Sequence, residues 1–338
     1  MEIVAPNFSH LLSMTDENGT FEHADHAEPR REHGYCTDDV ARVLLVVARE
    51  PSAHRDLVNL ARSSQEFLTA AQSDDGASRN RRSASGEWFG PFTTEDCWGR
   101  SIWAFGTAAA RSTDEAVRSN ATASFTRGAQ ARSRWPRSMA FAALGAAEVF
   151  EIDPSNTPAR DLLVDAGRLL HRPDVDERWR WGEPRLSYAN AALAEATMAV
   201  GRALGEDELV ETGLRQLQWL FDLETPESHL SVTPVGGRGR NERVPKFDQQ
   251  PIEVAAMSDA CVRALTITGD AKWREALELC ALWFMGINDL GVPMYDAVTG
   301  GGYDGLTERG PNQNQGAEST IALLTTLQHV RQAVQLAT

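Results

Sequence analysis

The sequence predicts an all-α protein whose helices form an (α/α)6 toroid, with six inner helices and about six outer ones, in one domain spanning residues 1–338. Six short motifs each place polar residues at the start of an apolar helix, and amphipathic helices alternate with them. No low-complexity or Pro/Ser-rich linker divides the chain, although its length alone favours two domains. The six motifs are YCTDDVARVLL (35–45), TEDCWGRSIWAF (94–105), WPRSMAFAALG (135–145), LSYANAALAEA (186–196), FDQQPIEVAAM (247–257) and NQGAESTIALL (314–324).

The inner helices are marked by apolar side chains on every face. In 39–49, Val40, Val43 and Val47 recur at helical spacing, and leucine, valine and alanine fill the remaining faces. A helix that is apolar all round is buried on all sides. The predicted inner helices cover 39–49, 95–110, 136–150, 187–204, 251–268 and 317–335.

The intervening helices carry one apolar stripe and one charged face, which is typical of an outer layer. In 55–72, Leu57, Leu60 and Phe67 form the stripe, and Arg55 and Glu66 belong to the solvated face. The predicted outer helices cover 55–72, 114–129, 158–171, 206–223 and 271–286. The segment before residue 15 can supply the sixth by pairing with the C-terminal helix. The inner helices start at irregular intervals of roughly 40–70 residues, which favours a closed ring over an open solenoid.

Long segments precede four of the inner helices and therefore lie on one rim of the ring. They cover 15–37, 73–94, 225–250 and 288–316. Loops of this length are usually functional. The alternation of Ser, Val and Thr at 230–235, together with paired glycines, predicts small β-hairpins on this rim.

Carboxylates gather at the starts of the inner helices. Asp38 and Asp39 follow Thr37, the expected N-cap, and Glu95 and Asp96 repeat the pattern. Capping explains one acid in a first turn, but adjacent acids at two helices that face one mouth exceed that need. Crowded carboxylates can push their pKa values apart and create an acid–base pair. The candidate catalytic residues are Asp38, Asp39, Glu95, Asp96, Asp248 and Glu318.

Amides, arginines and rim aromatics accompany these acids and suit the hydroxyl groups and ring faces of a sugar. Gln250 is also the expected N-cap of its helix, where Pro251 and Glu253 form an ordinary start, so Glu253 is interpreted as structural. Trp98 lies inside an inner helix, where packing in the core is the favoured explanation. The candidate substrate contacts are Arg30, His33, Tyr35, Trp98, Arg100, Arg137, Tyr188, Asn190, Gln249, Gln250, Tyr303 and Asn314.

Composition and missing motifs exclude several classes of function. The net charge of −15 argues against nucleic acid or an anionic membrane as partner. No apolar run is long enough to span a membrane and no secretion signal is visible, so a cytoplasmic protein, monomeric or homodimeric, is expected. Dinucleotide, ATP and serine-hydrolase motifs are missing, and no cofactor is expected.

A metal site at His23 and His26, which stand three residues apart, is a minor alternative. We expect no metal, because these residues lack a recognised ligand spacing. The four cysteines form no CxxC pair and are expected to be buried, reduced thiols.

Four motifs together resemble a known group of proteins: PRREHGYCTDDVAR (29–42), TEDCWGR (94–100), FDQQPIE (247–253) and NQGAEST (314–320). They are similar to the (α/α)6-barrel proteins of carbohydrate metabolism, and more narrowly to bacterial proteins associated with glycosyltransferases and mannoside phosphorylases. The resemblance covers nearly the whole chain. It implies a polar sugar pocket at the inner helix starts, but that fold hosts several reactions and does not choose among them.

The leading hypothesis from the sequence is a glycoside hydrolase-like enzyme in which two carboxyl groups act as acid and base on a glycosidic bond of an oligosaccharide or other small glycoside. Phosphorolysis in place of hydrolysis stays open. One alternative is a sugar epimerase or isomerase, which transfers a proton at the carbon next to a carbonyl. The other is a sugar-binding protein without catalysis.

Overall fold

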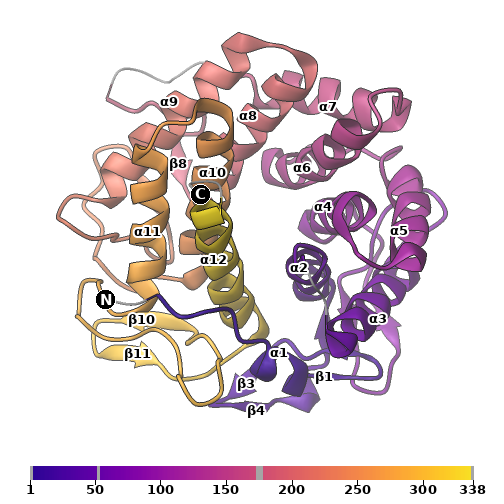
Figure 1. The fold of residues 1–338 in the computed structure, drawn as a ribbon, viewed down its shortest axis with the longest axis horizontal. Coiled ribbons are helices and arrows are strands. Elements are labelled where there is room, and N and C mark those ends of the chain that lie inside the picture. The colour runs from indigo at the N-terminus through magenta and orange to yellow at the C-terminus, as the bar shows by residue number, and fades with distance from the viewer. Residues whose placement is uncertain (1–2, 52–53, 173–177, 336–338) are drawn as a thin grey trace.

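The computed structural model describes residues 3–51, 54–172 and 178–335, and it is a ring of helices (Figure 1). The predicted all-α toroid is confirmed. The inner helices are α2 (Thr37–Ala48), α4 (Asp96–Arg111), α6 (Pro136–Ile152), α8 (Ala191–Leu204), α10 (Pro251–Thr268) and α12 (Ala317–Gln335). Each contacts the next around the ring, and α12 contacts α2, which closes it.

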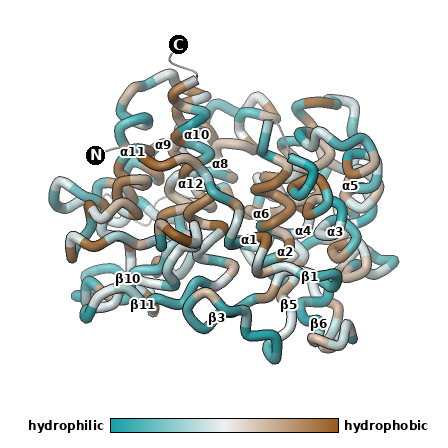
Figure 2. Tube along the Cα trace, turned by 60° about the horizontal axis from the view of Figure 1, so that its bottom comes forward, coloured by the Kyte–Doolittle hydropathy of each residue, from teal (hydrophilic) through white to brown (hydrophobic). Residues whose placement is uncertain are grey.

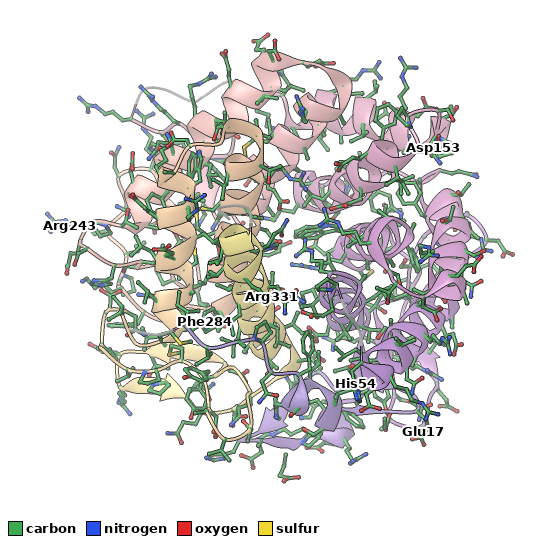
Figure 3. All side chains as sticks on the ribbon, viewed as in Figure 1. Glu17, His54, Asp153, Arg243, Phe284 and Arg331 are labelled. Carbon is green, nitrogen blue, oxygen red and sulfur yellow. The ribbon has the colours of Figure 1, made fainter. Side chains whose placement is uncertain are left out.

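The outer helices are α3 (Arg55–Ala71), α5 (Glu115–Gly128), α7 (Thr157–Leu170), α9 (Asp207–Glu224) and α11 (Lys272–Phe284). The short helix α1 (Ser9–Ser13) contacts α12 and is the sixth outer element, as expected from the sequence. Side chains project outward around the ring, with Asp153 and Arg243 at its outer edge (Figure 3). In the part of the chain that is described, no helix is both long and apolar enough to cross a membrane.

Glycines allow the inner helices α4 and α6 to pack with their backbones in close approach. A Cβ atom on Gly106 would lie 2.1 Å from the carbonyl oxygen of Gly145, and one on Gly99 would lie 2.3 Å from that of Ser138. Any larger residue at these positions would push the two helices apart. This contact therefore fixes the spacing of two helices whose N-terminal ends carry candidate site residues.

Short antiparallel strands gather on one rim of the ring (Figure 2). They join loops that are far apart in the sequence. The loop before α2 pairs with the loop before α4, and the loop before α8 pairs with the loop before α10. The strands are β1 (Thr15–Asp16) with β2 (Gly19–Thr20), β3 (Ala24–Asp25) with β4 (Glu28–Pro29), β5 (Tyr35–Cys36) with β6 (Arg81–Arg82) and β7 (Trp88–Phe89), β8 (Arg185–Leu186) with β9 (Arg238–Gly239), and β10 (Gly305–Thr307) with β11 (Gly310–Asn312).

Three sequence predictions need correction. No hairpin forms at 230–235, because the backbone N–H groups of Ser231 and Val235 donate to Glu224 and Asp248 instead of to a neighbouring strand. Helix α8 starts at residue 191 and not at 187, because Ala189 has a positive φ of 44°. The N-cap of α2 is Cys36, while the Thr37 hydroxyl donates to the carbonyl of Arg79.

Candidate functional site

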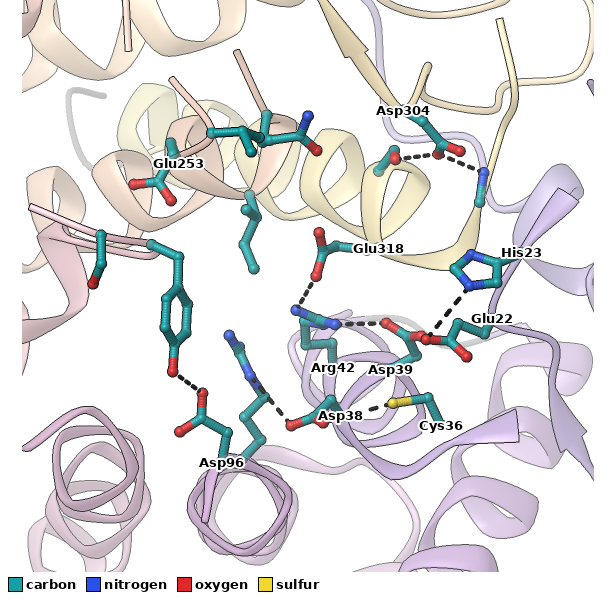
Figure 4. A pocket seen from close by; sticks show the side chains of 18 of the residues that line it. Glu22, His23, Cys36, Asp38, Asp39, Arg42, Asp96, Glu253, Asp304 and Glu318 are labelled. Atoms are coloured by element: carbon teal, nitrogen blue, oxygen red, sulfur yellow. Dashed lines mark hydrogen bonds and ion pairs between the residues drawn. The ribbon is translucent and has the colours of Figure 1, made fainter. Parts of the chain in front are cut away.

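A cavity of about 750 Å³ opens at the N-terminal ends of the inner helices, within the rim of hairpins (Figure 4). We call it the central cavity. Carboxyl groups from four inner helices and two rim loops face it, together with three guanidinium groups. The charged lining residues are Glu22, Asp38, Asp39, Arg42, Arg81, Asp96, Arg100, Glu253, Asp304 and Glu318.

Asp38 occupies the first turn of α2 and lines the cavity beside Arg100 of α4. Its Oδ1 atom is buried without a hydrogen-bond partner and lies 3.6 Å from Nε of Arg100. The Arg100 guanidinium lies 4.0 Å from the centroid of the Phe141 ring, which holds its plane. Burial lowers the pKa of Arg100, but a guanidinium stays charged. A carboxylate without a strong donor thus lies next to a fixed positive charge.

Arg42, one helical turn after Asp39, joins two further carboxylates. Its guanidinium lies 2.6 Å from Asp39 and 2.8 Å from Glu318 of α12, as Figure 4 shows. Burial raises the pKa of Asp39 to about 7, although Arg42 acts in the opposite direction. Asp39 is buried, whereas 42% of the Glu318 side chain is exposed. The buried Asp39 carboxyl group therefore holds the Arg42 guanidinium, which in turn holds the exposed Glu318 carboxylate at the cavity.

Asp96, in the first turn of α4, accepts hydrogen bonds from two hydroxyl groups and forms no ion pair with a cation among the described residues. Ser138 donates to one carboxylate oxygen at 2.7 Å, and the Tyr188 hydroxyl donates to the other at 2.5 Å. Burial and the charge of Asp96 raise the pKa of Tyr188, so its hydroxyl keeps its proton. Tyr188 comes from the loop before α8 and links that loop to α4.

Glu253 is the anchor of the turn that carries Tyr188. Its carboxyl group accepts hydrogen bonds from the backbone N–H groups of Ala189 and Asn190 and from the Asn190 side chain. Arg137 donates to the carbonyl of Tyr188 and to the Asn190 side chain. The structural interpretation of Glu253 agrees with these contacts, and burial raises its pKa to about 7.

Glu22, Cys36 and Asp39 are the one group of potential metal ligands found among the described residues, with ligand atoms within 4.8 Å of one another. Arg81 already pairs with Glu22, and Arg42 pairs with Asp39. Burial raises the pKa of the Cys36 thiol well above its ordinary value. A protonated thiol and two neutralised carboxylates are poor ligands for a cation.

The structure brings only part of the predicted site together. Asp38, Asp39, Asp96, Glu318, Arg100, Tyr188 and Gln250 line the central cavity. Glu95 and Arg137 line an adjoining space of about 650 Å³, which we call the side groove. Among the remaining candidates, Asp248, Arg30, His33, Tyr303 and Asn314 line neither space.

The other candidates are engaged in the framework of the protein. Tyr35 is buried and donates to Asp16, and Trp98 is buried and donates to the carbonyl of Gly128. Gln249 is buried between Asp289 and Trp283, and Asn190 belongs to the Glu253 network. Their polar groups are satisfied by protein partners, so their amides and hydroxyls do not reach a substrate.

Sequence reasoning missed several cavity residues. Arg42 stands three residues after Asp39, a spacing at which an arginine and an acid can meet on one helix face. Glu22, His23, Asn80 and Asp304 lie in the rim loops, and no helical periodicity marks them. Only the pairing of the loops places them at the cavity.

A second polar cavity of about 650 Å³ lies toward the C-terminal ends of the inner helices. Here charged groups are paired: Asp259 lies 2.8 Å from Arg49 and 2.6 Å from His329, and Glu195 lies 3.0 Å from Arg263. Between the two ends, the cavity along the ring axis has a volume of only about 40 Å³. It is lined mainly by apolar side chains, among them Leu45, Trp103, Phe141 and Ile321.

No protein-family model matches the chain, and no curated protein matches it. Solved structures do. A sugar epimerase from a ruminal bacterium superposes with a TM-score of 0.72 at 15% identity, over 96% of this chain and 95% of that one. A D-mannose isomerase gives 0.69 at 12% identity, over 96% and 95%. A glycosyl hydrolase of family 88 from Bacteroides vulgatus gives 0.60 at 10% identity, over 88% and 92%.

At these identities the likeness concerns the fold. The epimerase and the isomerase match this chain over almost their whole length, and the hydrolase matches less well. The fold that the resemblance implies is thus confirmed: the protein has the (α/α)6-barrel fold that these carbohydrate-active proteins share.

Proposed function

We propose that the protein is a sugar epimerase or aldose–ketose isomerase whose active site is the central cavity. The observation that carries the proposal is the buried, unpartnered Oδ1 of Asp38 beside the Arg100 guanidinium. Both reactions begin when a base removes the proton from the carbon next to the carbonyl of an open-chain sugar. Asp38 is the base, and Arg100 stabilises the negative enediolate oxygen.

The electron pair of the broken C–H bond moves toward the carbonyl, whose oxygen gains negative charge. An isomer forms when the neighbouring hydroxyl group passes its proton to the former carbonyl oxygen and the carbon proton returns to the former carbonyl carbon, so that a new carbonyl forms at the original carbon. An epimer forms when the carbon proton returns to the opposite face of the original carbon and the first carbonyl is restored. The latter needs a second group, and Glu318, exposed in the cavity and held by Arg42, is the candidate. The similarity to a sugar epimerase and a D-mannose isomerase supports this choice.

The Arg100 guanidinium beside Asp38 also favours this reaction over glycoside hydrolysis, although carboxyl groups outnumber guanidinium groups in the cavity wall. Hydrolysis passes through a positive, oxocarbenium-like transition state, which guanidinium groups destabilise. An enediolate is negative and is stabilised by them. Arg100 is the guanidinium group placed to do so, because Arg42 and Arg81 are already paired with carboxylates.

Glycoside hydrolysis is the second candidate, because the partners of Asp96 among the described residues are hydroxyl groups and this acid lies where the central cavity meets the side groove. A glycosidic bond across that junction would place its oxygen near this carboxyl group. Family 88 and family 9 hydrolases are also among the similar folds.

The test is incubation in D2O with a panel of reducing mono- and disaccharides, followed by NMR. We expect a new sugar with deuterium at the carbon next to the carbonyl, and loss of both signals in Asp38→Asn. Cleavage products without deuterium uptake would support the hydrolase instead. The absence of any conversion across the panel would contradict both.

A further inference from the structure

The side groove gathers the exposed aromatic rings of the protein. Within the described residues, four aromatic side chains are more than a third exposed: Phe89, Phe92, Trp135 and Tyr188. Phe89, Trp135 and Tyr188 line the groove, and Phe92 belongs to the same rim loop as Phe89. Exposed aromatics concentrated in one place mark a binding surface and are not explained by packing.

The groove is continuous with the central cavity. Both spaces are lined by Asp38, Asn80, Arg81, Asp96 and Tyr188. The opposite exit from the central cavity, along the ring axis, is the narrow apolar passage described above. A substrate larger than one sugar unit can therefore extend only toward the open rim, and the groove offers it a lined path.

The groove combines a flat apolar platform with polar groups at its edge. The guanidinium of Arg134 lies 4.5 Å from the centroid of the Trp135 ring and fixes the plane of the indole. Arg137 and Glu183 form a largely buried ion pair on the same wall, with 3.0 Å between the guanidinium and the carboxylate. A pyranose ring presents one apolar face and a rim of hydroxyl groups, and this arrangement complements both.

We infer that the substrate is an oligosaccharide of at least two units, whose reducing-end unit reacts in the central cavity while the next unit lies against Trp135 in the side groove. The statement that the bound sugar reacts rests on the proposed function. The statement that the protein binds two sugar units rests on the groove alone. The Asp96–Tyr188 pair then lies beside the linkage between the two units.

Binding to the Asp38→Asn protein tests the site without turnover. Calorimetry would compare the disaccharides cellobiose, mannobiose, lactose and maltose with glucose and mannose. We expect at least one disaccharide to bind about tenfold more tightly than its monosaccharide. Trp135→Ala should remove this difference, and Trp135→Phe should restore most of it. Ile152→Ala is the control and should leave the difference unchanged, because Ile152 is an exposed residue at the C-terminal end of α6, the helix that begins directly after Trp135.

The backbone hydrogen bonds of Trp135 persist in the alanine variant, so its folding is expected to be retained and is checked by thermal melting. Equal affinities for mono- and disaccharides, or an equal loss of both in Trp135→Ala, would overturn the inference. A disaccharide preference without conversion by the wild type would overturn the proposed function and leave the binding site in place.

Discussion

The two ends of the helical ring carry similar charged residues but use them differently. Toward the C-terminal ends of the inner helices, Asp259, Glu195 and Glu148 each lie within 3.0 Å of an arginine. At the N-terminal ends, Asp38 keeps an unpartnered oxygen and Asp96 binds only hydroxyl groups. Closely paired charges hold helices together. A carboxylate that lies 3.6 Å from its arginine, as Asp38 does, or that binds only hydroxyl groups stays available to a ligand.

The backbone contributes to this difference. Carboxylates at helix N-termini are stabilised by the helix dipole and need no cation, while arginines are favoured near C-termini. Asp38 and Asp96 occupy first turns, and Arg49 and Arg111 occupy the C-terminal ends of their helices. Helix direction thus allows an acid such as Asp96 to lie at one end bound only to hydroxyl groups, and it favours close ion pairs at the other end.

The sharpest test of the comparison is Asp38→Asn. If Asp38 is the base, kcat should fall by about 10³-fold while the melting temperature stays close to that of the wild type. Deuterium exchange into the sugar measures the activity. Asp207→Asn is the matched control, since Asp207 is an exposed acid in the first turn of an outer helix. Equal activity of the Asp38 variant and wild type would remove Asp38 from the mechanism.

At the other end, Asp259→Asn should affect stability and not chemistry. The change leaves Arg49 and His329 buried without their carboxylate, which costs about 3 kcal/mol of unfolding free energy. Urea denaturation measures it, and Asp165→Asn, which breaks half-exposed pairs, should cost less than about 1 kcal/mol. Loss of activity in the folded Asp259 variant would contradict the separation of the two ends.

The pH dependence of stability distinguishes unpaired from paired buried acids. Burial raises the pKa of Glu224 to about 8, and it lies under the cavity wall, bound to Thr233. In the unfolded chain the Glu224 carboxyl group loses its proton near pH 4.5, whereas in the folded protein it keeps the proton up to about pH 8. The free energy of unfolding should therefore fall as the pH rises from about 5 toward 8. Glu224→Gln should flatten the decline by about 2 kcal/mol between pH 6 and 8.

Asp259 behaves in the opposite sense. Although burial alone would raise its pKa, Arg49 and His329 hold it at about 2. Its contribution to stability is present above pH 4 and is lost only as the pH falls toward 2.

The measurement that checks the Glu224 prediction is urea denaturation of wild type and Glu224→Gln across pH 5–8. If the free energy of unfolding changed with pH by the same slope in both proteins, the assignment of this dependence to Glu224 would be refuted.

The smallest effect is expected for Tyr188→Phe, which removes the hydrogen bond to Asp96 and keeps the ring. Loss of a hydrogen bond to a charged group should lower kcat/KM about tenfold. The pH profile of kcat/KM is the informative readout, because a structural role alone would not move it. An unchanged rate and profile would mean that the hydroxyl only braces the loop before α8.

The sequence was informative wherever function follows from position on a helix. Because capping patterns are local, the motifs TDDV and TED predict acids in first turns, and Asp38, Asp39 and Asp96 do line the cavity. It was less informative for amides. The sequence predicts that the amides of Gln249 and Asn190 contact a substrate. In the structure both amides form hydrogen bonds with residues from distant segments, Gln249 with Trp283 and Asn190 with Glu253.

What the sequence by itself determined is the type of each helix and the rim on which the long loops lie, because periodicity and capping depend only on near neighbours. The tertiary structure decided which acids are paired. Arg42 meets Glu318, and Asp96 meets Tyr188, across 276 and 92 positions that only ring closure and loop pairing bring together. The energy of a buried carboxylate depends on such partners and on burial, and neither is written in local sequence.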